Sequence, residues 1–221
     1  MSITENLNEI NAKLPKGTRL VAVSKFHPVE SIMEAYMSGQ LVFGESRVQE
    51  LIEKQKILPN DIEWHFIGHL QTNKIRQIVP FVSLIHGVDS LKLLKEIDKE
   101  GQKINRIVPC LLQIHIAQEE SKFGFSTDEC LDFFKSGEWI DLKFVKLKGF
   151  MGMATLTKDE EQIRNEFRSL SSFFNEIKSS WFPSDASFCE ISMGMSDDYL
   201  IAIKEHSTMV RIGSAIFGSR Y

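Results

Sequence analysis

The chain has 221 residues, of which 43% are hydrophobic and 25% charged, a size and composition that predict one globular domain over residues 1–221. The formal net charge of −4 gives no overall attraction to nucleic acid. The polar N-terminus is unlike a secretory signal, and no apolar run reaches the roughly 18 residues needed to cross a bilayer. We therefore expect a cytoplasmic protein. Its three scattered cysteines predict buried free thiols rather than a metal site or disulfides.

A helix is expected first, at residues 3–13. After it, short apolar runs alternate with longer amphipathic ones along the whole chain. The expected strands are at residues 20–26, 41–44, 64–68, 84–88, 108–116, 144–151, 188–193 and 209–212. The expected helices are at residues 29–38, 48–58, 72–79, 91–103, 159–178 and 197–206, with one more from residue 126 or 127 to just before Gly137.

Eight strands that alternate with about as many helices predict a parallel α/β fold. Most of the strands are apolar without strict alternation, which is typical of strands that are covered on both faces. A single closed (β/α)8 barrel of the TIM type fits the count, although ~250 residues is more usual for that fold. An open doubly wound sheet remains the alternative.

Lys25 ends the first apolar run, which begins at Arg19. An ammonium group at that place is costly unless it is paired or takes part in chemistry. Desolvation would lower the pKa of the lysine and leave a neutral amine that can condense with an aldehyde. The alternative is a lysine whose side chain extends from the strand end into solvent.

Two segments near the C-terminus together indicate an anion site. The first, around Ser192, Met193 and Gly194, is a strand that ends in small residues before a helix. The second contains Gly213 and Ser214. Glycines and helix N-termini let a phosphate approach backbone N–H groups, and barrels often bind phosphate after strands seven and eight. The alternatives are ordinary turn chemistry and, at residues 196–197, a helix N-cap.

Arg211 lies in the last expected strand, between apolar neighbours and on the same face as Gly213. An arginine inside the fold requires a partner, which could be a ligand atom or the carboxylate of a structural ion pair. In a closed barrel the first and eighth strands are neighbours, so Lys25, Arg211 and the phosphate segments would converge. A phosphorylated aldehyde bound as a Schiff base explains both ends, and pyridoxal 5'-phosphate is the leading candidate. A sugar-phosphate lyase that uses Lys25 is the alternative with another chemistry.

Over nearly its whole length the chain resembles the pyridoxal phosphate homeostasis protein family. The resemblance rests on ordered segments at residues 22–25 (AVSK), 43–50 (FGESRVQE), 64–71 (WHFIGHLQ), 119–124 (EESKFG), 148–153 (KGFMGM), 192–196 (SMGMS) and 210–218 (VRIGSAIFG). One departure is Ser46, where the family usually has asparagine after Gly-Glu. Serine retains a hydrogen-bonding oxygen but loses the amide N–H donors.

The resemblance implies a barrel similar to the N-terminal domain of alanine racemase, with an extra N-terminal helix. It implies an internal aldimine between Lys25 and pyridoxal phosphate, with phosphate contacts from the region of Ser192, Gly213 and Ser214. Met193 is expected at the same pocket, and Arg211 is expected to face the pyridine nitrogen.

An arginine at that nitrogen favours a neutral pyridine, which stabilises a carbanion less well than a protonated one. A racemase also needs a second acid–base group on the opposite face of the ring, which related racemases take from a further domain of a partner subunit. Tyr36 and Tyr199 fall within expected helices, and Tyr221 is the last residue. His69 and His115 could supply a proton, although packing or capping roles are the alternative.

We therefore expect a monomeric protein that binds and hands over the cofactor to pyridoxal-phosphate-dependent apo-enzymes, without catalytic residues of its own. A cofactor-dependent amino-acid racemase is the alternative. The lysines at positions 54 and 56 are expected on a solvated helix face.

Overall fold

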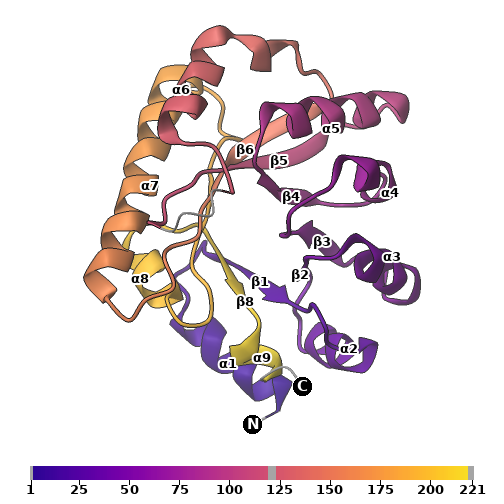
Figure 1. The fold of residues 1–221 in the computed structure, drawn as a ribbon. Helices are drawn as coiled ribbons and strands as arrows, with labels where there is room; N and C mark the ends of the chain where they lie inside the picture. The colour runs from indigo at the N-terminus through magenta and orange to yellow at the C-terminus, as the bar shows by residue number, and fades with distance from the viewer. Residues whose placement is uncertain (1, 119–122, 219–221) are drawn as a thin grey trace.

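The computed structural model describes residues 2–118 and 123–218. Eight parallel strands pair in chain order and close into a barrel (Figure 1). The strands are β1 (Arg19–Val23), β2 (Val42–Glu45), β3 (Glu63–Phe66), β4 (Leu84–Val88), β5 (Val108–Gln113), β6 (Val145–Met151), β7 (Glu190–Ser192) and β8 (Met209–Ile212). The closed barrel is confirmed and the open sheet is wrong, because β1 pairs with β8 along four residues, from Arg19↔Met209 to Ala22↔Ile212.

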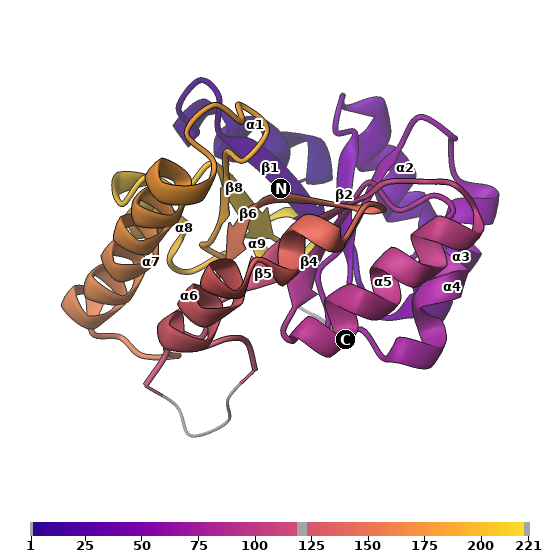
Figure 2. The same ribbon diagram turned by 90° about the horizontal axis from the view of Figure 1, so that it is seen from above.

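The helices form an outer layer around the strands (Figures 1 and 2). They are α1 (Ile3–Lys13), α2 (Val29–Met37), α3 (Val48–Ile57), α4 (Ile75–Ile78), α5 (Leu91–Lys103), α6 (Thr127–Ser136), α7 (Glu160–Trp181), α8 (Tyr199–Lys204) and α9 (Ser214–Phe217), with short 3-10 turns η1 (Thr72–Lys74) and η2 (Glu138–Asp141). The extra N-terminal helix α1 has the expected bounds and contacts α2 and α9. The sequence did not predict α9.

The strands are packed against apolar side chains on both faces, inside the barrel and outside it. Inside the barrel, Val21, Leu84, Leu111, Met151 and Met209 form one buried cluster. The larger cluster lies between the strands and the helices, where α7 buries one apolar stripe at helical spacing. Within the described ranges no helix is long and apolar enough to cross a bilayer.

Cys110 and Cys130 are buried free thiols, as expected, whereas Cys189 is a free thiol that is partly exposed.

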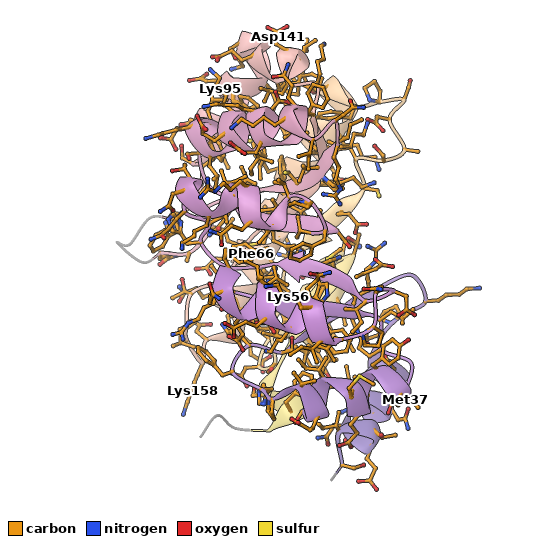
Figure 3. All side chains as sticks on the ribbon, turned by 90° about the vertical axis from the view of Figure 1, so that its right-hand side faces the viewer. Met37, Lys56, Phe66, Lys95, Asp141 and Lys158 are labelled. Carbon is orange, nitrogen blue, oxygen red and sulfur yellow. The ribbon has the colours of Figure 1, made fainter. Side chains whose placement is uncertain are left out.

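The face of the barrel covered by α3 and α5 is charged on its outer surface (Figure 3). Lys56 lies on the exposed side of α3, as predicted, and Lys95 lies on the outer face of α5. Lys54 is different: its side chain is only 7% exposed, so the expectation of a solvated side chain is wrong there. Because α3 packs one face on the strands, two lysines separated by two positions fall on opposite sides of it.

Candidate functional site

The loops that follow β1 and β8 meet at one end of the barrel. Lys25 lies in the turn immediately after β1 and is half-buried. Gly213 follows β8, and a Cβ atom built on it would lie 3.1 Å from the carbonyl oxygen of Val23. The ring of His27 stacks on that of Phe217 in α9, with centroids 4.8 Å apart. The lysine turn and the segment containing Gly213 and Ser214 are therefore neighbours, as the sequence predicts.

Arg211 points into the barrel, on a strand residue that pairs with Val21. Its guanidinium donates to the carbonyl oxygen of Ser192 at 2.7 Å, to the Ser192 hydroxyl at 2.6 Å and to the carbonyl oxygen of Gly152 at 2.9 Å. Across residues 2–118 and 123–218 no carboxylate comes within ion-pair distance of it. Burial lowers the pKa of Arg211 to about 10, opposed by the charge of Asp198, so the group stays cationic at neutral pH.

Three further buried side chains continue from Arg211 across the barrel interior. The Ser192 hydroxyl lies 3.0 Å from Nδ1 of His86, and Nε2 of His86 lies 3.0 Å from Nδ1 of His65. Burial lowers the pKa of His65 to about 3 and holds the pKa of His86 well below its usual value, so both imidazoles are neutral at pH 7.

The direction of these hydrogen bonds follows from Arg211, which can only donate. Ser192 accepts from the guanidinium, and the arrangement that gives its own proton an acceptor among these contacts is donation to Nδ1 of His86. His86 then carries its proton on Nε2 and donates it to His65. The hydroxyl of Ser192 is thus engaged on both sides, and Ser192 orients Arg211.

The loop after β7 contributes Ser196, which lies in the segment expected to bind an anion and for which a helix N-cap was the alternative interpretation. That interpretation is wrong, because the N-cap of α8 is Asp198. The Ser196 hydroxyl instead accepts from the backbone N–H of Gly213 at 3.4 Å. Met193, expected at the pocket, has a fully buried side chain in the outer core, and its N–H donates to the carbonyl oxygen of Met209.

Sequence reasoning missed a group of charged residues next to the lysine turn. Glu45, at the end of β2, and Glu50 of α3 both accept hydrogen bonds from Lys54. Glu45 and Lys54 also bond to Ser24, which precedes Lys25, and Glu50 bonds to Phe26, which follows it. For Glu45 and Glu50 the sequence signal was the resemblance of residues 43–50 to the family, whereas Lys54 was expected on a solvated helix face.

The described candidate acid–base residues come from elements other than β1 and β8. His69 is exposed and its Nδ1 lies 2.8 Å from Asp89, while the hydroxyl of Tyr36 donates to Asp61. His115 lines a rim cavity of about 270 Å³ with residues of the β5 and β6 ends. Tyr199 is buried at the start of α8. Tyr221 and the first four residues of segment 119–124 lie outside the described residues.

Comparisons with known proteins identify the family. The family model described as alanine racemase, N-terminal domain, matches residues 1–221. A pyridoxal phosphate homeostasis protein of Schizosaccharomyces pombe is 38% identical over 93% of this chain and 85% of its own. This chain belongs to the pyridoxal phosphate homeostasis protein family.

Solved structures agree with that membership. PipY of Synechococcus elongatus PCC7942, solved with pyridoxal phosphate bound, is a homologue with 34% identity and a TM-score of 0.88 over 98% of this chain and 100% of PipY. An alanine racemase of Clostridium difficile 630 matches 99% of this chain and 56% of its own at 15% identity, with a TM-score of 0.78. The second match shows the shared barrel fold alone. The expected likeness of this family member to the N-terminal domain of alanine racemase is confirmed.

Proposed function

We propose that this chain binds pyridoxal 5'-phosphate and takes part in its homeostasis, and that Lys25 holds the cofactor covalently as a Schiff base. The observation that carries the proposal is the pairing of β1 with β8, which brings Lys25, Gly213 and Ser214 to the end of the barrel towards which the Arg211 strand runs. The family membership and the pyridoxal phosphate in PipY support it.

The residues present fit the cofactor. Glycine at position 213 lets the end of β8 lie close to Val23, where a Cβ would press on the Val23 carbonyl oxygen, so the backbone N–H groups at the start of α9 lie beside the lysine turn, where they suit an anion. The hydroxyls of Ser196 and Ser214 are further phosphate donors. Arg211, a buried cation bonded to neutral oxygens in the described structure, suits the lone pair of a pyridine nitrogen.

Lys25 supplies the covalent step. Its neutral amine adds to the aldehyde carbon, a C=N bond forms, and the carbonyl oxygen leaves as water. When bound, the cofactor supplies an electrophilic aldehyde, which is reactive towards amines when free. Ser192 and His86 act through Arg211, whose guanidinium they keep in one orientation.

According to this proposal, the protein stores and releases the cofactor and does not convert a substrate at a substantial rate. A cationic partner for the ring nitrogen leaves the pyridine neutral, which is a weak electron sink for carbanion chemistry. We further propose that the protein acts in the cytoplasm as a monomer and that pyridoxal-phosphate-dependent apo-enzymes receive the cofactor. Steady formation of D-amino acids from L-amino acids, lost in Lys25→Ala, would overturn the absence of turnover.

The covalent proposal is tested by borohydride reduction of the purified protein after incubation with pyridoxal 5'-phosphate. We expect intact mass spectrometry to show one reduced adduct, and peptide mapping to place it on Lys25. Lys25→Ala should lose the adduct, whereas Lys56→Ala, on the exposed side of α3, should retain it. An adduct absent from Lys25 in the unaltered protein contradicts the proposal.

A further inference from the structure

The turn that carries Lys25 has an unfavourable backbone conformation. Phe26, the next residue, has a φ angle of +67°. A bulky side chain rarely adopts a positive φ, and such strain persists only where the surrounding structure enforces it. Neighbouring elements must therefore contact the turn strongly on both sides of Lys25.

Those contacts come from β2 and α3. On one side of Lys25, the Ser24 hydroxyl donates to Oε1 of Glu45 at 2.6 Å, and Nζ of Lys54 donates to the Ser24 carbonyl oxygen at 2.8 Å. On the other side, the backbone N–H of Phe26 donates to Oε1 of Glu50 at 2.6 Å. Hydrogen bonds to charged groups are shorter and stronger than those between neutral ones.

The three side chains also bind one another. Nζ of Lys54 lies 2.8 Å from Oε1 of Glu45 and 2.6 Å from Oε1 of Glu50. The side chains of Glu45 and Lys54 are 0% and 7% exposed, so little water competes for these bonds. Burial raises the pKa of Glu45, and the nearby charge of Lys54 opposes that shift. We call Glu45, Glu50 and Lys54 the carboxylate–lysine clamp.

We propose that the carboxylate–lysine clamp positions Lys25 for covalent capture of the cofactor. The inference rests on the proposed function and deepens it, since these residues bind the backbone on both sides of the reactive lysine. They are positioning residues, because the contacts that carry the inference are with Ser24 and Phe26, on either side of Lys25. A reacting group displaced by about 1 Å can react about a hundredfold more slowly, so a relaxed turn should slow capture.

The first test uses Glu50→Ala with Glu53→Ala as its matched control. Glu53 lies on the exposed side of the same helix, so the two variants make the same chemical change. Without cofactor, Glu50→Ala should raise amide hydrogen exchange at Phe26 by about tenfold or more, because its charged acceptor is gone. With pyridoxal 5'-phosphate, the rate of borohydride-trapped adduct at Lys25 should fall by about tenfold or more. Glu53→Ala should match the unaltered protein in both measurements.

A second comparison separates positioning from stability. Lys54→Met alone leaves Glu45 as an uncompensated buried charge, whereas the double variant Glu45→Gln/Lys54→Met removes both charges together. We expect the double variant to fold but to capture at Lys25 about tenfold more slowly or worse, with Lys56→Met unchanged. The thermal midpoint of each variant is measured beside capture.

The outcomes distinguish the two proposals. If the unaltered protein forms no adduct at Lys25, the proposed function fails, and the exchange of the Phe26 amide still decides whether the clamp fixes the turn. If the unaltered protein captures cofactor while the folded clamp variants do so at the same rate, the positioning inference is overturned and the proposed function stands.

Discussion

At the scale of single residues, the most consequential group is the buried chain from Arg211 to His65. It places a cation inside the barrel with no carboxylate at ion-pair distance in the described structure, and it satisfies that cation with neutral oxygens. The direction of donation requires Nδ1 of both histidines to be unprotonated. The site therefore depends on two imidazoles that remain neutral.

This dependence predicts how stability varies with pH. The folded-state pKa of His65 is about 3, whereas an unfolded histidine titrates near 6.5. Below about pH 6.5 the unfolded chain binds a proton that the folded chain excludes, so the free energy of unfolding should fall by about 1.4 kcal/mol per pH unit for each such histidine. Above that pH the contribution of His65 is fully present and constant.

The measurement is urea denaturation at several pH values between about 7 and about 5 for the unaltered protein and for His65→Asn. Asparagine retains an acceptor oxygen for His86 and does not titrate. The loss of stability between those pH values should be about 1.5–2 kcal/mol smaller in the variant. If the free energy of unfolding falls equally with pH in the two proteins, His65 is not held neutral in the fold.

At the scale of elements, β6 shows how one residue fixes strand register. The pairing of β5 with β6 runs Cys110↔Leu147 and then Leu111↔Gly149, so one residue of β6 is bulged. Gly149 has a φ of +141°, and a Cβ atom on it would lie 1.9 Å from the carbonyl oxygen of Glu190. Glycine is therefore required where β6 approaches β7.

We expect Gly149→Ala to reduce the free energy of unfolding by about 3 kcal/mol or more, or to abolish folding, because a backbone oxygen cannot move aside. Gly17→Ala is the matched control, since Gly17 also has a positive φ (+97°) but no atom lies within 4 Å of a built Cβ. That control should lose only about 1–2 kcal/mol. Comparable losses in the two variants, measured by thermal and chemical denaturation, would show that the close approach to β7 has no special cost.

At the scale of the whole molecule, closure of the barrel removes the exposed sheet edges through which chains pair. The outer faces of the helices are charged, as on α5, where Lys95 bonds to Glu138 and Lys103 bonds to Glu100. Both features favour a protein that does not self-associate.

We therefore expect light scattering coupled to size exclusion to give a molar mass close to 25.3 kDa, with and without added pyridoxal 5'-phosphate. Raising the protein concentration tenfold should leave the value unchanged. A mass of twice that size would contradict the monomer and would direct attention to the apolar side chains exposed near the loop ends, such as Phe26 and Met195.

Much of the fold was predictable from local pattern. All eight strands and the main helices are where the apolar runs predict them, because burial between two layers demands continuous apolar segments in strands and a 3.6-residue stripe in helices. Apart from the unpredicted α9, the errors lie at element ends: the strand expected at residues 108–116 ends at Gln113, and the helix expected at 159–178 continues to Trp181. Ends are set by hydrogen bonds to distant segments, such as the one from His115 to the carbonyl oxygen of Phe125.

The sequence by itself determined the number and order of the strands, the strand-end lysine, the interior arginine and, through its motifs, the family. Only the tertiary structure decided that the barrel closes, that the Ser192 hydroxyl bonds to Arg211, and that Lys54 is buried and bonds to the carbonyl oxygen of Ser24. The physical reason is separation along the chain. His86 and Ser192 are 106 residues apart, and no local pattern encodes a hydrogen bond that exists only once the strands have paired.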